Sequence, residues 1–233
     1  VYVCWYFRSW KINNPEIKFQ NQNIIVFNKP NGLLTHPNSK SNEKTLRDFL
    51  LEVAPNIKDC GEEYREGIVH RLDRVTSGLI VCAINHETYT ILKNEFKDRK
   101  VNKKYLAIVQ GNLSSESGKI ELPIKRSESN RSKRSIGKNG RLSISEYEVI
   151  KKNSGYSLIS INLITGRNHQ IRAQMEYLNT PVVNDTLYGA ELNKHIPPNA
   201  ICLHSNNLNF KLFNEEFSFE SPPPEFFNKV LEV

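Results

Sequence analysis

One carboxylate with cationic neighbours stands directly before an apolar run, in the segment HRLDRVTSG (residues 70–78). Asp73 lies between Arg71 and Arg74, and nearby positive charges favour the ionised form of a carboxyl group. An ionised carboxylate in this position is a candidate for catalysis. A second interpretation stays open, because loop aspartates before strands often only hydrogen-bond to local backbone amides.

A second polar segment, TGRNHQIR, places a sharp turn at Gly166 and then opens a predicted helix. Arg167, His169 and Arg172 cannot all point into an apolar core. Arg172 either pairs with Glu176 one turn further on or turns inward to meet a carboxylate. His169 is more typical of a hydrogen-bonded residue at a helix start than of a metal ligand or a base.

Two further segments carry polar groups that do not identify a reaction by themselves. In RKVNKKYL, Tyr105 enters a predicted strand directly after a basic cluster. It is either a half-buried aromatic residue or a platform on which an extruded base stacks. In FNKPNGLLTHP, Lys29 precedes a loop marked by Pro30, Gly32 and Pro37, and this loop has no phosphate-cradling glycine pattern.

Strands joined by short turns must position these groups. Apolar runs and alternating patterns predict strands, and apolar residues at helical spacing predict helices. The predicted strands are residues 24–28, 78–84, 105–109, 145–150 and 156–163, with short strands at LNFKL and FSF. The predicted helices are residues 45–54, a helix capped by Asn85, residues 169–178 and a short C-terminal helix. This order favours an α+β domain with a mixed, mostly antiparallel sheet and flanking helices.

The chain is basic, with a net charge of +7 and an isoelectric point near 9.2. This charge favours a polyanionic partner, either nucleic acid or an anionic membrane surface. No apolar run approaches the ~18 residues of a membrane span, and no signal-peptide pattern is present. The four cysteines include no CxxC pair. We therefore expect neither a disulfide framework nor a zinc site, and a cytoplasmic location.

One basic segment stands out, KRSESNRSKRSIGKNGR (residues 125–141), with seven basic residues and one acidic residue. Its Ser, Asn and Gly content predicts a mobile loop or a hairpin. It is either a solvated surface loop or an arm that contacts phosphates.

Taken in order, four segments resemble the signature segments of the RluA-type RNA pseudouridine synthases. They are FNKPNGLLTHP, HRLDRVTSGLIVCAIN, FKDRKVNKKYLAIVQG and TGRNHQIRAQMEYLNTPVVNDTLYG. The closing segment ICLHSNNLNF, followed by a strand and PPPEFF, is also similar to that family. The resemblance covers residues 24–227. It implies the pseudouridine synthase catalytic fold with a central active-site cleft, and it implies that no metal or organic cofactor is used.

The resemblance also implies residue roles. Asp73 matches the essential aspartate, which acts on the ribose end of a target uridine so that the glycosidic bond breaks. The freed uracil rotates and reattaches through its carbon 5. Tyr105 matches the tyrosine that stacks on the base and assists proton removal from that carbon, and Arg172 matches the arginine that pairs with the aspartate. The expected substrate-binding residues are Arg71, Ile171, His169, Arg167 and Lys29.

Two features depart from the family pattern. The helix reads RAQ after HQI where relatives often carry RVH, and we expect this to alter a contact near Arg172. Larger members carry a small N-terminal RNA-binding domain, which is absent here. We therefore expect a catalytic domain at residues 24–233, preceded at residues 1–23 by an arm, a linker or the remnant of such a domain. The start at Val1 rather than Met indicates that the natural N-terminus is missing.

Two rival functions remain. A metal-dependent nuclease or phosphoesterase would use His70, Asp73 and His169, but such sites usually hold a dense carboxylate cluster. A catalytically silent RNA-binding or assembly factor would keep the same fold, and the presence of Asp73, Tyr105 and Arg172 together argues against it. The expected protein is therefore an RNA pseudouridine synthase that acts as a monomer on structured ribosomal or transfer RNA, with no membrane partner.

Overall fold

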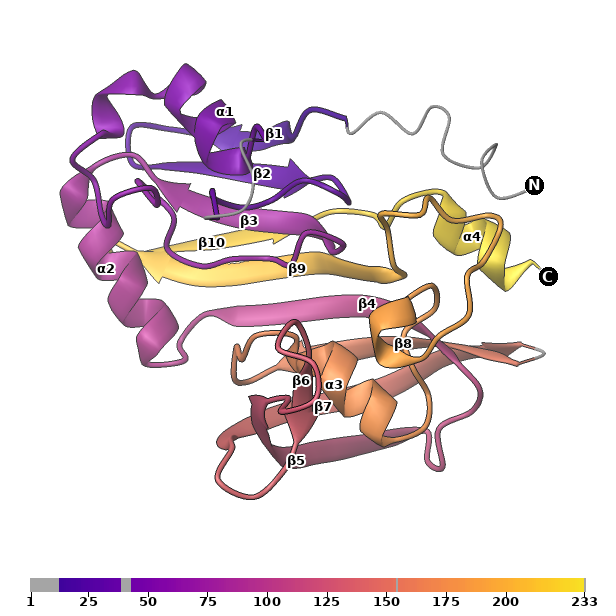
Figure 1. Cartoon of the computed structure of the whole chain (residues 1–233). Helices are drawn as coiled ribbons and strands as arrows, with labels where there is room; N and C mark the ends of the chain where they lie inside the picture. Colours follow the sequence, from indigo (N-terminus) through magenta and orange to yellow (C-terminus); the bar gives the residue numbers. More distant parts are fainter. Residues whose placement is uncertain (1–12, 39–42, 154, 233) are drawn as a thin grey trace.

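The computed structural model describes residues 13–38, 43–153 and 155–232, and its centre is a large sheet (Figure 1). Within these ranges the strand order is β1-β2-β3-β9-β4-β8-β7-β5-β6, and β10 pairs with β9. The strands are β1 (Glu16–Gln20), β2 (Ile24–Lys29), β3 (Ser77–Ala83), β4 (Asn102–Gln110), β5 (Ser117–Arg126), β6 (Arg134–Ile136), β7 (Arg141–Asn153), β8 (Tyr156–Leu163), β9 (Leu203–Leu212) and β10 (Glu215–Glu220). Apart from the parallel pair β3 and β9, the pairings of these strands are antiparallel. The predicted mixed, mostly antiparallel sheet is confirmed.

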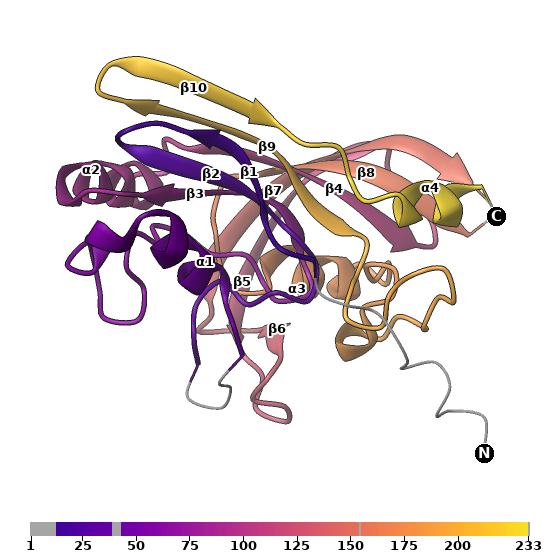
Figure 2. The same ribbon diagram turned by 90° about the horizontal axis from the view of Figure 1, so that it is seen from above.

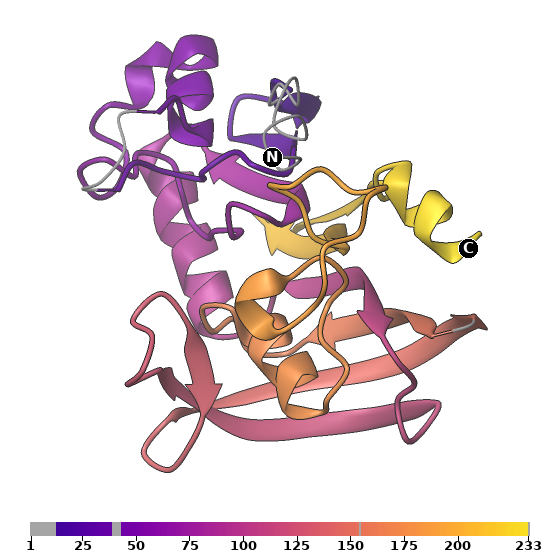
Figure 3. The same cartoon turned by 45° about the vertical axis from the view of Figure 1, so that its right-hand side comes forward.

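Helices cover the sheet unevenly. They are α1 (Leu46–Val53), α2 (His86–Lys97), α3 (Gln170–Tyr177) and α4 (Phe226–Leu231), with 3₁₀ turns η2 (Pro55–Ile57) and η3 (Thr186–Tyr188). Seen from above, α1, α3 and β6 lie on the same side of the sheet (Figure 2). On that side α3 packs against β5 and β6 (Figure 3). No helix in the described ranges is long and apolar enough to cross a membrane.

The core forms where the sequence predicted its buried strands. Every residue of β3 is buried, and β2 is buried except at Asn28, as continuous apolar runs predict. The first two helices begin at side-chain caps. Thr45 forms a capping box with Asp48, and the Asn85 side chain accepts a hydrogen bond from the Thr88 amide at 2.9 Å. The predicted cap at Asn85 is therefore confirmed.

The N-terminal arm differs in part from the expectation. Residues 16–20 form β1, which pairs antiparallel with β2, so this stretch belongs to the sheet. Its sequence resembles a linker because the strand lies at an edge and is mostly exposed, where polar residues are normal. Phe19 alone of the five packs against the core. The aromatic-rich residues 1–12 lie outside the described residues.

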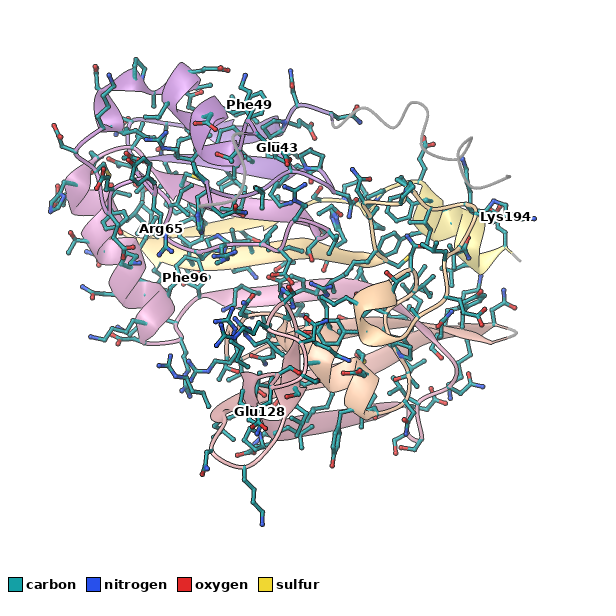
Figure 4. The ribbon with its side chains drawn as sticks, in the orientation of Figure 1. Glu43, Phe49, Arg65, Phe96, Glu128 and Lys194 are labelled. Carbon is teal, nitrogen blue, oxygen red and sulfur yellow. The ribbon has the colours of Figure 1, made fainter. Side chains whose placement is uncertain are left out.

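The basic segment at residues 125–141 forms a hairpin, one of the two predicted alternatives. Its first residues end β5 and its last residue begins β7. Between them, β6 pairs antiparallel with β5 through Lys125 and Ser135. The glutamate of the connecting turn, Glu128, accepts from Lys125 at 2.6 Å and is labelled in Figure 4. We call residues 125–136 the basic hairpin.

A short parallel junction joins the two halves of the sheet. β3 and β9 share two register pairs, Ser77 with His204 and Gly78 with Ser205. The backbone of Gly78 has a φ of 114°, and a Cβ there would lie 2.3 Å from the Ser205 carbonyl oxygen. A side chain is therefore excluded by both backbone conformation and space. This junction lies four residues after Asp73 and fixes where that loop enters the sheet.

We expect Gly78→Ala to destabilise the protein, because the left-handed backbone and the Ser205 backbone both oppose a methyl group. The free energy of unfolding, measured in urea, should fall by about 2–4 kcal/mol. Gly155→Ala is the matched control, since Gly155 has a φ of 87° but a methyl group there would meet nothing within 4 Å. That change should cost only about 1 kcal/mol. Equal losses in the two variants would contradict the close approach of β3 and β9.

Candidate active site

A cavity of about 850 Å³ opens where four segments meet. Its walls are the loop at residues 69–73, the C-terminal part of α2, the first half of β4, and residues 163–172. Asp73, Tyr105, Ile171 and Arg172 all line it. The structure therefore brings together residues that are 99 positions apart in the sequence, as the resemblance implied.

The loop that carries Asp73 is held by the loop that follows β2. The Thr35 hydroxyl donates to the Leu72 carbonyl at 2.9 Å, and the Asn31 side chain donates to the Val75 carbonyl at 2.6 Å. The Gly32 amide donates to the Arg74 carbonyl at 2.8 Å. These bonds engage the backbone on both sides of Asp73. The aspartate therefore stands on a fixed loop, and its side chain remains free to face the cavity.

Lys29 takes part in this support and does not bind at the cavity. Its side chain is fully buried, and its ammonium donates to the carbonyls of Leu33 at 2.8 Å, Pro30 at 3.0 Å and Arg74 at 3.4 Å. Burial lowers its pKa to about 7, against the opposing influence of the Asp73 charge. Lys29 does not line the cavity, and the three hydrogen bonds of its ammonium go to the two loops.

Arg172 is a buried cation shared by two carboxylates. Its Nη1 donates to Asp73 Oδ2 at 3.2 Å, so the expected ion pair is present. Its Nε and Nη2 donate to the two oxygens of Asp185 at 2.6 and 2.9 Å. Burial alone would lower the pKa of Arg172, but the hydrogen bonds and charges of Asp185 and the charge of Asp73 raise it. The alternative pair with Glu176 does not form, since Glu176 pairs with Lys133.

His169 lies beside Asp73 and belongs to a chain of hydrogen bonds. Its Nε2 is 3.8 Å from Asp73 Oδ2, and its Nδ1 is 2.9 Å from the hydroxyl of Tyr188. That hydroxyl accepts from the Arg134 amide at 2.8 Å, so its own proton is free to be donated to Nδ1. The proton of the neutral imidazole then sits on Nε2, facing Asp73. Burial lowers the pKa of His169, which favours this neutral form.

The turn before α3 is made by His169 and not by Gly166. His169 has a φ of 54°, in the left-handed region, whereas Gly166 does not need a positive φ. Gln170 then anchors the helix, because its side chain accepts from the Thr165 hydroxyl at 2.8 Å and donates to the Ser145 hydroxyl at 2.9 Å. The left-handed residue begins α3 with its imidazole in the wall of the cavity, beside Asp73.

The glutamine of RAQ, Gln174, contacts β7, whereas we expected this departure from the family pattern to alter a contact near Arg172. Gln174 accepts from the Ser145 hydroxyl at 2.8 Å and donates to the Ser143 hydroxyl at 3.3 Å. Both serines belong to β7. The glutamine side chain therefore fastens α3 to the sheet, and its hydrogen bonds are made to these serines and not to Arg172.

Tyr105 enters the cavity from β4 and is almost fully buried. Burial raises its pKa to about 12, so its phenol is protonated at neutral pH.

Arg71 lines the cavity and donates to His36 Nε2 at 2.9 Å. Arg167 also lines it, and its Nε donates to the Leu142 carbonyl at 3.2 Å. Four of the five expected substrate-binding residues thus reach the cavity, with Lys29 the exception.

The geometry does not support the metal-dependent nuclease. His70 stacks on Phe96 with ring centroids 4.3 Å apart, and its Nε2 accepts from the Val81 amide at 3.1 Å. It therefore serves the core, and burial lowers its pKa to about 3. Within the described residues, no group of three or more His, Cys, Asp and Glu side chains is arranged to hold a metal ion.

Two residues of the site were not singled out from the sequence. Asp185 is the bidentate partner of Arg172, and Tyr188 packs its ring 4.8 Å from the guanidinium centre. Both lie in the segment TPVVNDTLYG, which carried part of the family resemblance. No local pattern marks Asp185, because its contact with Arg172 depends on how the chain folds back after α3.

Comparison with known proteins agrees with the geometry. A family model described as RNA pseudouridylate synthase matches residues 23–177. The ribosomal large subunit pseudouridine synthase D of Borreliella burgdorferi is 40% identical, over 86% of this chain and 64% of that protein. The protein of the same name from Pseudomonas aeruginosa is 34% identical, over 94% of this chain and 71% of that protein. The chain thus spans about two thirds of the length of these relatives, and slightly less in the first case.

A solved structure shares the fold. Human RNA Pseudouridylate Synthase Domain Containing 4 aligns with a TM-score of 0.74 and 24% identity, and covers 93% of this chain and 91% of that one. At this identity the likeness shows the fold. It confirms the catalytic fold that the resemblance implied.

We expect Asp185→Asn to destabilise the protein by about 3–5 kcal/mol, because it leaves the buried Arg172 with a weaker partner. Urea denaturation measures the change. Glu216→Gln is the control, since it breaks the exposed pair with Lys211 at 2.9 Å and should leave the unfolding midpoint unchanged. An Asp185→Asn protein as stable as the wild type would show that Arg172 does not depend on Asp185.

Proposed function

Because this chain belongs to the RNA pseudouridylate synthase family, and within it resembles the RluA type, we propose that it isomerises uridine to pseudouridine in ribosomal RNA, with Asp73 as the catalytic carboxylate. The observation that carries this proposal is the ion pair of Asp73 with Arg172 at the cavity. The pair orients the carboxylate where a nucleotide can enter. Asp73 itself is partly exposed, at 16% of its side chain, so it can reach a ligand.

The charge of the cavity supports an RNA substrate. Among its described lining residues one is a carboxylate, Asp73, and seven are cations: Arg71, Lys93, Lys97, Arg99, Lys103, Arg167 and Arg172. Such a surface attracts the phosphates of a polyanion. Extruding a uridine from a stacked RNA costs a few kcal/mol, and contacts of this kind can offset that cost.

The proposed reaction conserves atoms. Asp73 acts at the ribose, the bond from N1 to C1′ breaks, and the uracil turns so that C5 bonds to C1′. The proton on C5 then leaves to solvent, and N1 takes one up. In this proposal Arg172 orients Asp73, and Tyr105 stacks on the uracil as a neutral phenol whose hydroxyl assists the proton transfer. Arg71 holds the place of the extruded nucleotide.

The finer parts of the proposal concern substrate and setting. Structured ribosomal RNA is the proposed substrate, with transfer RNA as the alternative, and the protein is proposed to act as a monomer in the cytoplasm. Among the described residues, Cys60, Cys82 and Cys202 are free thiols, which agrees with a reducing compartment. The catalytic domain is proposed to include β1, which pairs with β2.

We expect the wild-type protein to release tritium to water from RNA that carries tritium at uracil carbon 5. Asp73→Asn should reduce this release below detection, because the amide cannot act as the carboxylate does. Asp59→Asn, which changes an exposed aspartate, is the control and should release tritium at the wild-type rate. Circular dichroism checks that all three proteins are folded.

Two outcomes would overturn the proposal. Release of tritium by the Asp73→Asn variant would remove Asp73 from the chemistry. A wild-type protein that binds RNA without release, on a set of ribosomal and transfer RNA substrates, would favour the catalytically silent RNA-binding factor.

Residues 131–141, which run from the basic hairpin to the start of β7, are proposed to contact phosphates. Arg131, Lys138 and Arg141 are exposed and form no ion pair with another described residue. Changing all three to Gln should lower the slope of log affinity against log salt by about 2–3 for a structured RNA, at roughly 0.9 for each lost phosphate contact. Fluorescence anisotropy at several salt concentrations measures the slope. The control changes three exposed lysines elsewhere, Lys58, Lys151 and Lys229, and an equal effect there would contradict a specific role for the hairpin.

A further inference from the structure

Two buried lysines differ in how their charges are satisfied. The ammonium of Lys29 donates to three carbonyls. Lys103 is also buried, with 7% of its surface exposed, but its ammonium forms no hydrogen bond and no ion pair with any described residue. This ammonium lies over the ring of Phe96, labelled in Figure 4, at 5.6 Å from the ring centroid. A buried charge without a polar partner is unfavourable.

The strand places this ammonium in the active-site cavity. Residues two apart on a strand share a face, and on β4 the buried residues Lys103 and Tyr105 both line the cavity, whereas Lys104 is exposed on the other side. A Cβ on Gly166 would lie 4.0 Å from the Lys103 ammonium. The ammonium thus faces the turn that leads to Arg167 and His169.

The surroundings of Lys103 offer it no anion. Burial lowers its pKa to about 8, and no neighbouring carboxylate raises it. The one carboxylate among the described lining residues, Asp73, is paired with Arg172. Lys103 remains mostly protonated at neutral pH and has donors to offer to a ligand.

The cations continue outward from this point. A second cavity, of about 240 Å³, shares Arg99, Leu163 and Ile164 with the first and is lined also by Lys100. Arg99 borders both cavities and adds to the cations beside Lys103, whereas Lys100 is paired with Glu95 and Asp98. A row of cations fits a polymer that carries a negative charge at every unit better than it fits the neutral carbonyl of a single base.

We propose that Lys103 binds a backbone phosphate next to the uridine that enters the cavity. The proposal rests on the proposed function and names a contact for it. The phosphate supplies the anion that the protein itself does not provide, and the contact fixes the strand while Tyr105, two residues further along β4, meets the base.

The test uses the full chain and a fluorescein-labelled RNA decamer of adenylate with one central uridylate. Lys103→Met should weaken binding by about tenfold, as for loss of one charge-assisted bond, and should lower the salt slope by about 0.7. Lys103→Arg keeps the charge and should restore the slope. Lys104→Met is the matched control on the exposed side of the strand and should behave as the wild type.

A second arm locates the phosphate. Two decamers carry a neutral methylphosphonate, one on the 5′ side and one on the 3′ side of the uridine. The wild type should lose affinity for one of them by about the same factor as Lys103→Met loses for the normal decamer, and Lys103→Met should be insensitive to that replacement. If Lys103→Met loses affinity with an unchanged salt slope and both proteins remain sensitive to the two replacements, Lys103 contacts the base and the proposal is wrong.

Separate measurements test the folding of the Lys103→Met variant and the activity of the wild type. Because Lys103→Met removes an unpaired buried charge, it should unfold in urea at a concentration no lower than the wild type does. Binding of the decamer is measured without turnover. An unchanged salt slope therefore overturns only the role of Lys103, whereas absence of tritium release from the wild type overturns the proposed function.

Discussion

The position of the guanidinium of Arg172 between two carboxylates is the constraint on which the rest of the site depends. A buried cation must be paired and hydrogen-bonded, and Asp185 takes two of its nitrogens. One nitrogen is left to face Asp73. The place of Asp185 is itself fixed by the sheet, because the Val183 amide donates to the Ile108 carbonyl and the Cys202 amide to the Val183 carbonyl. The direction of Asp73 is thus set by backbone bonds to β4 and β9, far from it in sequence.

The same aspartate is held from the other side by backbone bonds rather than by charge. The loop after β2 binds the carbonyls of Leu72, Arg74 and Val75, so it fixes the chain without touching the carboxylate. Lys29 joins this loop to the Asp73 loop. The two supports are complementary, because one fixes where the backbone runs and the other fixes where the side chain points. A carboxylate held in this way needs little reorganisation when a ligand arrives.

The sequence predicted the strands with continuous apolar runs and the helices with clear caps, since these depend on local patterns. It also placed Asp73, Tyr105 and Arg172 together, but only through the family resemblance. Local patterns could not reveal Asp185, because its contact with Arg172 depends on how the chain folds back after α3. The burial of Lys29 away from the cavity could not be predicted, because the sequence does not show which lysines are buried. β1 was missed for the opposite reason, as an exposed edge strand carries the polar residues of a linker.

The charge of the cavity is positive because its lining residues include more cations than carboxylates. Arg172 is shared by Asp73 and Asp185, and the six other cations that line the cavity repel one another across a partly buried space. This repulsion, and the desolvation of Lys103, raise the free energy of the protein without ligand. In the proposed complex a polyanion relieves both, so part of its affinity comes from the removal of an unfavourable interaction and not only from new contacts. In this proposal, the cations that line the cavity therefore lower the stability of the free protein and raise its affinity for a polyanion. A binding site built from like charges is expected to have both effects.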